Sequence, residues 1–259
     1  MFMKYIVLVV LLFSTQLFGD KVIAYSNSNG YGFVKLLLTN PMYGKEEAEK
    51  RKAKVQYITN IKIMADDKLI LNMKTSPFMS KNPFLAFSYK NIIPSNVILI
   101  SQDNYNVIKK VSRKIKLLKK DAKRLNSWKI KNLPTLNISK KLSSSIRKVY
   151  GDIELIEEHV GLKTPRLSEN ASAIPIKIKS DINVKSVTLF AEVNKNINNG
   201  ELLFICQWIS TPYSVVNYQT KIKMADTGTV QVVLEGKDGK FYTAKTIVEV
   251  SVAGLNCGG

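Results

Sequence analysis

The stretch Tyr57–Met73, YITNIKIMADDKLILNM, decides the fold expected for the N-terminal half of this chain. Over Tyr57–Met64 the side chains fall into two alternating sets, and a period of two residues is the period of a β-strand. Asp66-Asp67 then supplies residues that favour a turn, and a second apolar run, Lys68–Met73, follows at once. The stretch therefore predicts a β-hairpin.

Three further short runs with strand character flank this hairpin, and turn residues such as Asn40-Pro41 and Asn82-Pro83 separate them. Five short strands with a turn every few residues are typical of an all-β sandwich or barrel, not of alternating strands and helices. The pattern predicts a first β domain over residues 20–104. Its three additional strands are expected at Phe33–Leu38, Phe84–Tyr89 and Val97–Ser101.

A second series of strand patterns fills the C-terminal half. Turns at 198–200 and 235–239 carry Asn and Gly, which tolerate the positive φ angles of tight hairpins. A short helix is predicted ahead of the strands, over Ser139–Tyr150, with Ser139 as its N-cap. A second all-β sandwich over 138–259 follows. Its strands are expected at Ala173–Ile178, Val184–Val193, Leu202–Trp208, Ser214–Ile222, Thr229–Glu235 and Phe241–Val252.

The segment between the two β regions, residues 105–137, is strongly basic. Residues 105–149 hold 15 lysines and arginines against Asp121 alone, and they supply +14 of the formal net charge of +19. Apolar residues recur at steps of three and four from Val107 to Leu125, which predicts a basic amphipathic helix. This helix is either a solvated spacer or a docking element for anionic lipid or an acidic partner. The expected fold is all-β, with two sandwich domains joined by a basic helical linker.

Residues 1–19 have the organisation of a secretory signal peptide. Lys4 gives a positive start, Ile6–Phe13 an apolar core and Ser14–Gly19 a polar exit with small residues. Cleavage near Gly19 starts the mature chain at Asp20 and places it in an oxidising compartment outside the cytoplasm. Two other interpretations stay open, a buried apolar strand and an uncleaved membrane anchor.

The residue patterns of common enzymes do not occur in the sequence. His159 is the only histidine, no glycine-rich phosphate loop follows a strand, and no serine or cysteine has a histidine at a recognisable spacing. Glu157, Glu158 and His159 form a polar cluster, which we expect to be solvated because a metal normally has three protein ligands or more. We therefore expect no catalytic residue, no metal site and no cofactor.

The two cysteines lie in contrasting surroundings. Cys206 lies within the apolar run Leu202–Trp208, where a free cysteine behaves as a small buried hydrophobe. Cys257 stands near the chain end among glycines, which favours a flexible arm that presents the thiol to a partner. A disulfide with Cys206 or with a second copy, and a tail without function, remain alternatives. The predicted arm consists of Gly254, Leu255, Asn256, Cys257, Gly258 and Gly259.

At these residues the C-terminal half resembles SoxY, the sulfur-carrier subunit of thiosulfate-oxidising Sox systems, which typically ends in Gly-Gly-Cys-Gly-Gly. The N-terminal half resembles SoxZ, the obligate partner of SoxY. The chain thus looks like a SoxZ–SoxY fusion. The SoxZ resemblance lies in Asn40-Pro41-Met42 and Ser80–Phe87. The SoxY resemblance lies in Val149–Asp152, Leu167–Ile176, Val187–Glu192, Asp238–Phe241 and the tail.

The resemblance implies two immunoglobulin-like β-sandwiches that pair tightly, and a periplasmic carrier that is itself a substrate of other enzymes. It assigns the covalent attachment of sulfur intermediates to Cys257, with Gly258 and Gly259 as the matching tail. Leu255-Asn256 departs from the family pattern, which has a Gly-Gly pair there.

The implied partners are the haem-containing thiosulfate transferase SoxAX and the sulfate-releasing hydrolase SoxB, with the sulfane dehydrogenase SoxCD as a further candidate. The carrier itself needs no cofactor, and export argues against nucleic acid as a partner. The alternative function is a basic amphipathic module that binds a membrane or a partner, in which the terminal thiol is incidental. We expect membrane contact to be the lesser of these possibilities.

Overall fold

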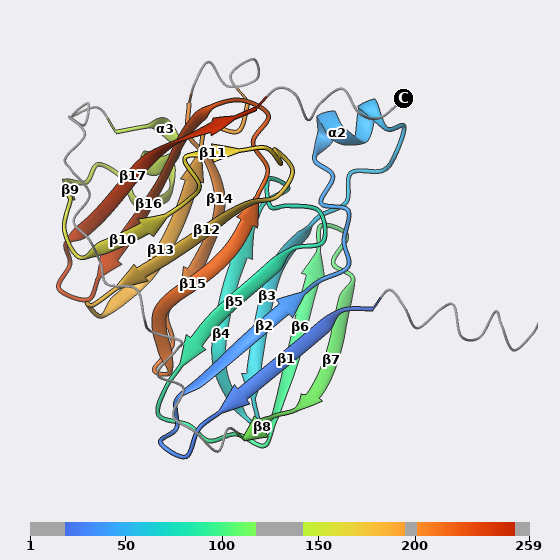
Figure 1. Cartoon of the computed structure of the whole chain (residues 1–259), viewed down its shortest axis with the longest axis vertical. Coiled ribbons are helices and arrows are strands. Elements are labelled where there is room, and N and C mark those ends of the chain that lie inside the picture. The colour runs from blue at the N-terminus through green and yellow to red at the C-terminus, as the bar shows by residue number, and fades with distance from the viewer. Residues whose placement is uncertain (1–18, 118–141, 195–200, 252–259) are drawn as a thin grey trace, which may run out of the picture.

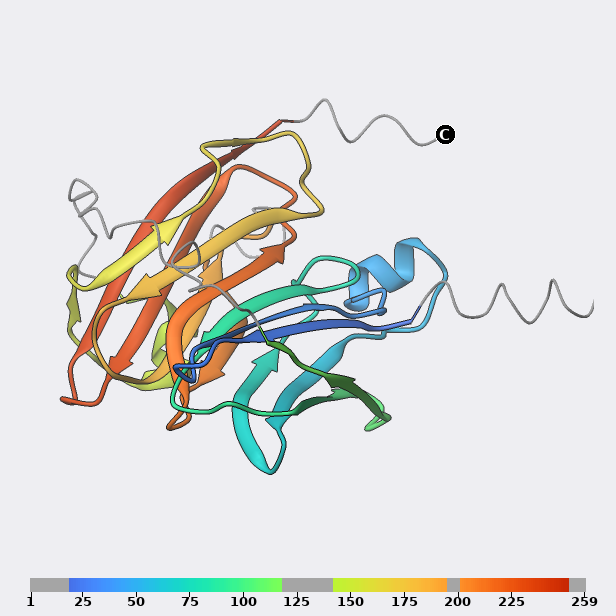
Figure 2. The same ribbon diagram turned by 60° about the horizontal axis from the view of Figure 1, so that its bottom comes forward.

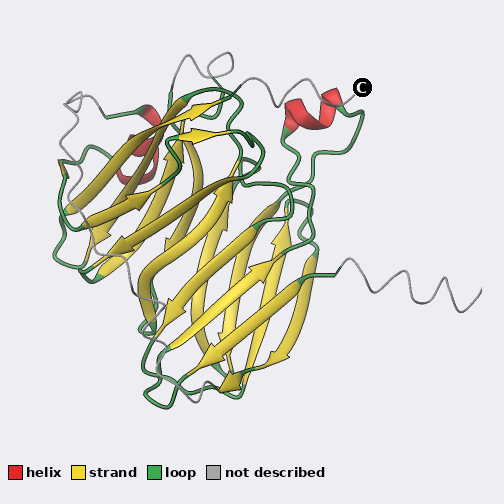
Figure 3. Ribbon diagram, viewed as in Figure 1, coloured by secondary structure: helices red, strands yellow, loops and turns green. Residues whose placement is uncertain are grey.

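The computed structural model describes residues 19–117, 142–194 and 201–251, and these form an all-β protein with two immunoglobulin-like sandwiches (Figures 1 and 3). Among these residues no helix is long and apolar enough to cross a membrane. The N-terminal half contains β1 (Lys21–Ser26), β2 (Gly32–Leu37), α2 (Lys45–Lys50), β3 (Ile58–Ala65), β4 (Lys68–Thr75), β5 (Phe84–Tyr89), β6 (Asn96–Asp103), β7 (Ile108–Lys114) and β8 (Lys116–Leu117). The C-terminal half contains α3 (Ser144–Tyr150), β9 (Leu155–Ile156), β10 (Val160–Lys163), β11 (Leu167–Ser168), β12 (Ile174–Ser180), β13 (Val184–Ala191), β14 (Leu203–Ile209), β15 (Ser214–Ile222), β16 (Gly228–Gly236) and β17 (Phe241–Val250).

Two sheets run without a break through both halves of the molecule, one in front of the other (Figures 1 and 2). The seven-stranded sheet has the order β10-β12-β15-β5-β2-β1-β8. The ten-stranded sheet has the order β11-β17-β16-β13-β14-β4-β3-β6-β7, and β9 pairs with β17. The halves meet where β15 pairs antiparallel with β5 and β14 pairs antiparallel with β4. Main-chain hydrogen bonds therefore join the two sandwiches edge to edge.

The hairpin expected at Tyr57–Met73 is confirmed as β3 and β4. Asp66 takes a positive φ of 51° in the turn, and its carboxylate accepts hydrogen bonds from the backbone N–H groups of Ser95 and Asn96. The other strands expected in both halves also form, within a few residues of their predicted ends. The strand β1 was not expected from the sequence; it lies directly after the predicted signal and turns Val22 and Ala24 into the core.

The helix expected from Val107 to Leu125 is wrong over Ile108–Leu117, where the chain forms the strands β7 and β8. Val111 and Ile115 pack against the core, and the four-residue step between them suits one face of a strand as well as one face of a helix. Pairing with β6 satisfies an edge that would otherwise be open. The first sandwich thus continues beyond residue 104, and the rest of the predicted linker, 118–137, lies outside the described residues.

The short helix ahead of the second sandwich forms as α3. Its N-cap is Ser143, whose hydroxyl accepts a hydrogen bond from the backbone N–H of Ile146, and not Ser139, which lies outside the described residues. Ile146 is buried against Phe190 and Val233 on the outer face of the ten-stranded sheet. The helix therefore covers that face over the C-terminal half.

One aromatic stack lies between the two sheets at the junction of the halves. Trp208 on β14 and Tyr218 on β15 are parallel, with their ring centroids 4.9 Å apart and an interplanar angle of 1°. Across the junction, Trp208 is opposite Met73 of β4 and Tyr218 is opposite Phe87 of β5. All four side chains are buried, so the cores of the two sandwiches are continuous.

Replacing Trp208 with Ala should lower the free energy of unfolding by about 3–5 kcal/mol, because it empties a large buried volume and removes the stack. Chemical denaturation monitored by circular dichroism measures this loss. The control is Ile247→Ala on β17, where the side chain is 51% exposed and the expected change is within about 0.5 kcal/mol. Equal effects of the two substitutions would contradict the role assigned to the stack.

The stability of the protein should also depend on the proton of Tyr218. Burial raises the pKa of Tyr218 from 10.0 to about 12, while a hydrogen bond with Ser214 acts in the opposite direction. The folded state holds this proton more tightly than the unfolded state, so the stabilisation is complete below pH 10 and is lost as the pH rises towards about 12. We expect wild type to lose about 2–3 kcal/mol relative to Tyr218→Phe across this range.

Denaturation curves of both proteins at several pH values between 9 and 12 test this dependence. Tyr105→Phe serves as the control, because Tyr105 is 54% exposed and its loss should leave the wild-type pH profile unchanged. A Tyr218→Phe profile parallel to that of wild type would contradict the prediction.

Candidate functional site

The last strand, β17, ends at Val250, a few residues before the predicted cysteine arm, and hydrogen bonds hold this end of the strand on the sandwich. The backbone N–H of Val250 donates to the Thr227 hydroxyl oxygen at 2.9 Å, and the backbone N–H of Ser251 donates to the carbonyl oxygen of Ser168 at 3.0 Å. The short strand β11 pairs in parallel with the last residues of β17. The chain is thus held by neighbouring segments up to Ser251.

The predicted attachment residue and the other residues of the arm lie outside the described residues, so the structure does not test them. They are Gly254, Leu255, Asn256, Cys257, Gly258 and Gly259. The C-terminal end of β17 lies at the same end of the molecule as α2 (Figure 1). The loop that leads into α2 carries the first SoxZ-like motif, and the second motif spans the loop before β5 and the start of that strand.

The two SoxZ-like motifs, which are far apart in the sequence, contact each other directly. The backbone N–H of Asn82 donates to the carbonyl oxygen of Asn40 at 2.8 Å, and the side-chain oxygen of Asn82 accepts from the backbone N–H of Asn40 at 3.2 Å. Asn82 has a φ of 50°, a conformation that Asn adopts more readily than most residues. The two motifs therefore act as one structural unit that joins the loops before α2 and before β5.

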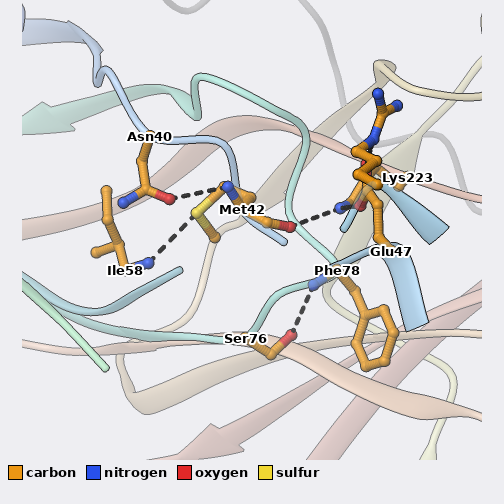
Figure 4. Close-up of polar contacts among 8 residues, drawn as sticks. Asn40, Met42, Glu47, Ile58, Ser76, Phe78 and Lys223 are labelled. Atoms are coloured by element: carbon orange, nitrogen blue, oxygen red, sulfur yellow. Dashed lines mark hydrogen bonds and ion pairs between the residues drawn. The ribbon is translucent and has the colours of Figure 1, made fainter. Parts of the chain in front are cut away.

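Met42, the last residue of the first motif, is fully buried and has a φ of 55°. The side-chain oxygen of Asn40 accepts a hydrogen bond from the backbone N–H of Met42 at 2.8 Å, and the Met42 sulfur lies 3.4 Å from the backbone nitrogen of Ile58 (Figure 4). A methionine at positive φ is unusual, and these contacts hold it in place. The carbonyl oxygen of Met42 is thereby available to the second half.

Lys223, which follows β15, connects the second half to this unit. Its ammonium donates to the carbonyl oxygen of Met42 at 2.7 Å and forms an ion pair with the Glu47 carboxylate on α2 at 2.5 Å (Figure 4). Its backbone N–H donates to the carbonyl oxygen of Phe78 at 3.0 Å. The Lys223 side chain is 20% exposed, so solvent screens the pair only in part. We call this set of contacts, Met42, Glu47, Phe78 and Lys223, the interdomain clamp.

Cys206 is fully buried on β14, as expected from its apolar surroundings. It is opposite Thr75 of β4 across the junction and opposite Leu189 of β13 on the other side. Burial raises the pKa of the Cys206 thiol well above its usual value, which keeps the sulfur protonated. Since the thiolate is the nucleophilic form, Cys206 is a packing residue and not a reactive one.

The polar cluster around His159 lies at the surface, as expected. The His159 side chain is 42% exposed, and its Nδ1 lies 3.1 Å from a carboxylate oxygen of Asp181. Its ring also makes an edge contact with Tyr242. Across the residues that the structure describes, no group of three or more His, Cys, Asp or Glu side chains is arranged to hold a metal ion.

In the sequence, Asn40-Pro41-Met42 is recognisable only as a family motif, and nothing in it indicates the contact with Lys223. No local signal marks Lys223, which is 181 residues from Met42 and stands in an ordinary turn sequence. Glu47 of α2 likewise stands in a run of charged residues that carries no family motif. Only the fold brings these charges together.

The fold and the clamp define a class of protein: two immunoglobulin-like sandwiches joined by shared sheets and closed by a charged contact between the halves. Comparison with protein families names the two halves. The family "Sulphur oxidation protein SoxZ" matches residues 23–108, and the family "Sulfur oxidation protein SoxY" matches residues 146–255. The chain is therefore a SoxZ–SoxY fusion and belongs to the sulfur-oxidation proteins.

Comparison with curated proteins gives no match. Among solved structures, the chain is similar to the sulfur carrier protein SoxY from Chlorobium limicola f thiosulfatophilum, with 21% identity, 41% of this chain and 93% of that chain covered, and a TM-score of 0.35. It is also similar to a superoxide reductase (neelaredoxin) from Ignicoccus hospitalis, with 7% identity, coverage of 36% and 81%, and a TM-score of 0.33.

Replacing Lys223 with Ala should lower the free energy of unfolding by about 1–2 kcal/mol, because the Met42 carbonyl and the Glu47 carboxylate both lose a charged donor. Glu47→Ala should lower the free energy of unfolding by less than Lys223→Ala does, because Lys223 keeps its hydrogen bond to the Met42 carbonyl oxygen. A double-mutant cycle by chemical denaturation measures the coupling between the two side chains, which we expect to exceed about 0.5 kcal/mol. Lys237→Ala in the exposed β16–β17 turn is the control, and additive effects of the two clamp substitutions would contradict the pair.

Proposed function

We propose that this chain carries sulfur intermediates covalently on Cys257 in the periplasm and presents them to the enzymes of thiosulfate oxidation. The observation that carries the proposal is the order of the two families in one chain, SoxZ over 23–108 and then SoxY over 146–255. In this order the SoxY half follows the SoxZ half, and the segment that holds Cys257 comes after the last strand of the SoxY half, β17. The N-terminal signal pattern supports export.

Two properties of the protein support Cys257 as the loading point. Hydrogen bonds hold the chain up to Ser251, so a segment of six residues leads from a fixed point to the thiol. Such a segment spans at most about 20 Å when extended, which is long enough to reach into the cleft of an enzyme. The other thiol, Cys206, is buried and protonated and cannot compete for the substrate.

The proposed cycle begins when the Cys257 thiolate forms a sulfur–sulfur bond with the outer sulfur of thiosulfate. This step releases two electrons, which the haem-containing transferase accepts and passes on. Water then attacks the terminal sulfone in the hydrolase; the bond between the sulfone sulfur and the sulfane sulfur breaks, sulfate and two protons leave, and a persulfide stays on Cys257. A sulfane dehydrogenase can then oxidise the sulfane sulfur to a sulfonate, with water as the oxygen source and its own electron acceptor taking up the electrons. A second hydrolysis releases this sulfonate as sulfate and returns the Cys257 thiolate. Alternatively, an acceptor thiolate attacks the sulfane sulfur, becomes a persulfide itself and displaces the Cys257 thiolate.

In this cycle the chain supplies a nucleophile and a scaffold, and its partners supply catalysis. The proposed partners are the transferase SoxAX and the hydrolase SoxB, with the sulfane dehydrogenase SoxCD as a further candidate. The carrier requires no cofactor of its own for these steps. The fused SoxZ half holds its partner sandwich at a high effective concentration, so the carrier stays assembled when it is dilute.

Intact-mass spectrometry of the mature chain tests the proposal after incubation with thiosulfate and the haem transferase. We expect an adduct of one thiosulfate on wild type and none on Cys257→Ser. Cys206→Ala is the matched control, because it removes the other thiol and should load like wild type. The proposal is wrong if no adduct forms on wild type, or if an adduct forms on Cys257→Ser.

A further inference from the structure

The outer face of the ten-stranded sheet is covered over the SoxY half and open over the SoxZ half. On the SoxY half, α3 packs Ile146 against Phe190 and Val233. On the SoxZ half, the strands β4, β3, β6 and β7 present the same face, and none of their residues belongs to the cluster that α3 covers. We call the side chains of these four strands that point away from the core the open face.

The register of the strands shows which side chains share the open face. Lys110 of β7 is opposite Ile100 of β6, Ile100 is opposite Lys62 of β3, and Lys62 is opposite Asn72 of β4. Residues directly opposite each other in antiparallel strands project on the same side of the sheet. The neighbouring rows are Gln102, Asn60 and Lys74 on one side, and Ser112, Ile98 and Met64 on the other.

The open face is positively charged, and the strands that form it carry almost no acid. Lys62, Lys74, Lys110 and Lys114 are exposed, and none of them takes part in a salt bridge with another described residue. The only carboxylate within the four strands is Asp103, which is buried and accepts hydrogen bonds from the turn that follows it. Asp66 and Asp67 lie in the β3–β4 turn at one end of the face.

Between the lysines the open face is apolar and amide-rich. Ile98, Ile100 and Met64 are half-buried, and Asn60 and Gln102 stand beside them. Half-buried apolar side chains with amides and a charged rim are the usual anatomy of a protein interface. None of the described strands places an aromatic ring on this face, whereas surfaces that lie in bilayers rely on aromatic anchors. The chemistry of the face therefore fits an acidic protein surface better than a membrane.

We propose that the open face docks an acidic surface of the enzyme that loads Cys257. This proposal rests on the proposed function and adds a second contact to it, apart from the thiol. Complementary charge speeds encounter and fixes orientation, and it is sensitive to salt. A second contact also raises the effective concentration of the thiol in the enzyme's cleft. The SoxZ half thereby becomes the recognition half, and the SoxY half becomes the carrier half.

Isothermal titration calorimetry of the mature chain with the haem transferase tests the docking contact, in a Cys257→Ser background where no adduct can form. Lys62→Ser combined with Lys110→Ser should weaken binding by about three- to tenfold at low salt, and the difference should shrink as the salt concentration rises. The matched control is Lys163→Ser with Lys177→Ser. These two lysines are also exposed and opposite each other, on the seven-stranded sheet, and their loss should leave the dissociation constant unchanged.

Three results would overturn the docking proposal: no binding in the Cys257→Ser background, equal weakening by the two pairs of substitutions, or no effect of either pair. Sedimentation with vesicles of phosphatidylglycerol and phosphatidylcholine in equal parts provides the other arm. Binding to these vesicles that is lost with Lys62 and Lys110 would replace the acidic protein with a membrane. A failure of the proposed carrier function can be distinguished from a failure of the docking proposal. If only the carrier function is wrong, no thiosulfate adduct forms on wild type, but calorimetry still detects docking.

Discussion

The antiparallel pairing of β14 with β4 and of β15 with β5 is the constraint on which the rest of the structure depends. The end strand of a sheet leaves a row of N–H and C=O groups without partners, and such edges attract other chains. Each half of this protein has two such edges at the junction, and the other half closes both of them. The pairing also encloses the stack of Trp208 on Tyr218, because it places Met73 and Phe87 of the first half opposite these two residues. Neither half by itself could bury this stack or close these edges.

The pairing has a direct consequence for the second contact between the halves. Once the strands are in register, the turn after β15 reaches the loop before α2, and Lys223 meets the Met42 carbonyl and Glu47. The two SoxZ motifs are needed for this contact, because the bonds between Asn40 and Asn82 hold the loop and Met42 in their unusual conformations. A family motif that looks like a simple turn in the sequence is thus part of the joint between SoxZ and SoxY.

The two cysteines show how the fold separates packing from chemistry. Cys206 lies at the junction strand β14, where burial keeps its thiol protonated and where its size suits the position opposite Thr75. Under the proposed function, the reactive thiol is placed after the last strand instead, beyond the hydrogen bonds that hold Ser251. Under the docking proposal, the open face on the SoxZ half adds recognition of the partner enzyme. Carrier chemistry, assembly and docking then occupy different parts of one chain.

The sequence by itself determined the strand content, because the alternation of side chains along a strand and the residues of the turns are local signals. It also determined the family, because the SoxZ and SoxY motifs are short stretches of sequence. Residues Val107–Leu125 show its limit: a four-residue apolar step fits a strand and a helix equally, and only the unpaired edge of β6 decides for the strand in β7. The sequence also marked Cys257, whereas the continuous sheets, the clamp and the open face were decided by the tertiary structure alone. They depend on main-chain pairing and on contacts across as many as 181 residues, for which side-chain patterns leave no local trace.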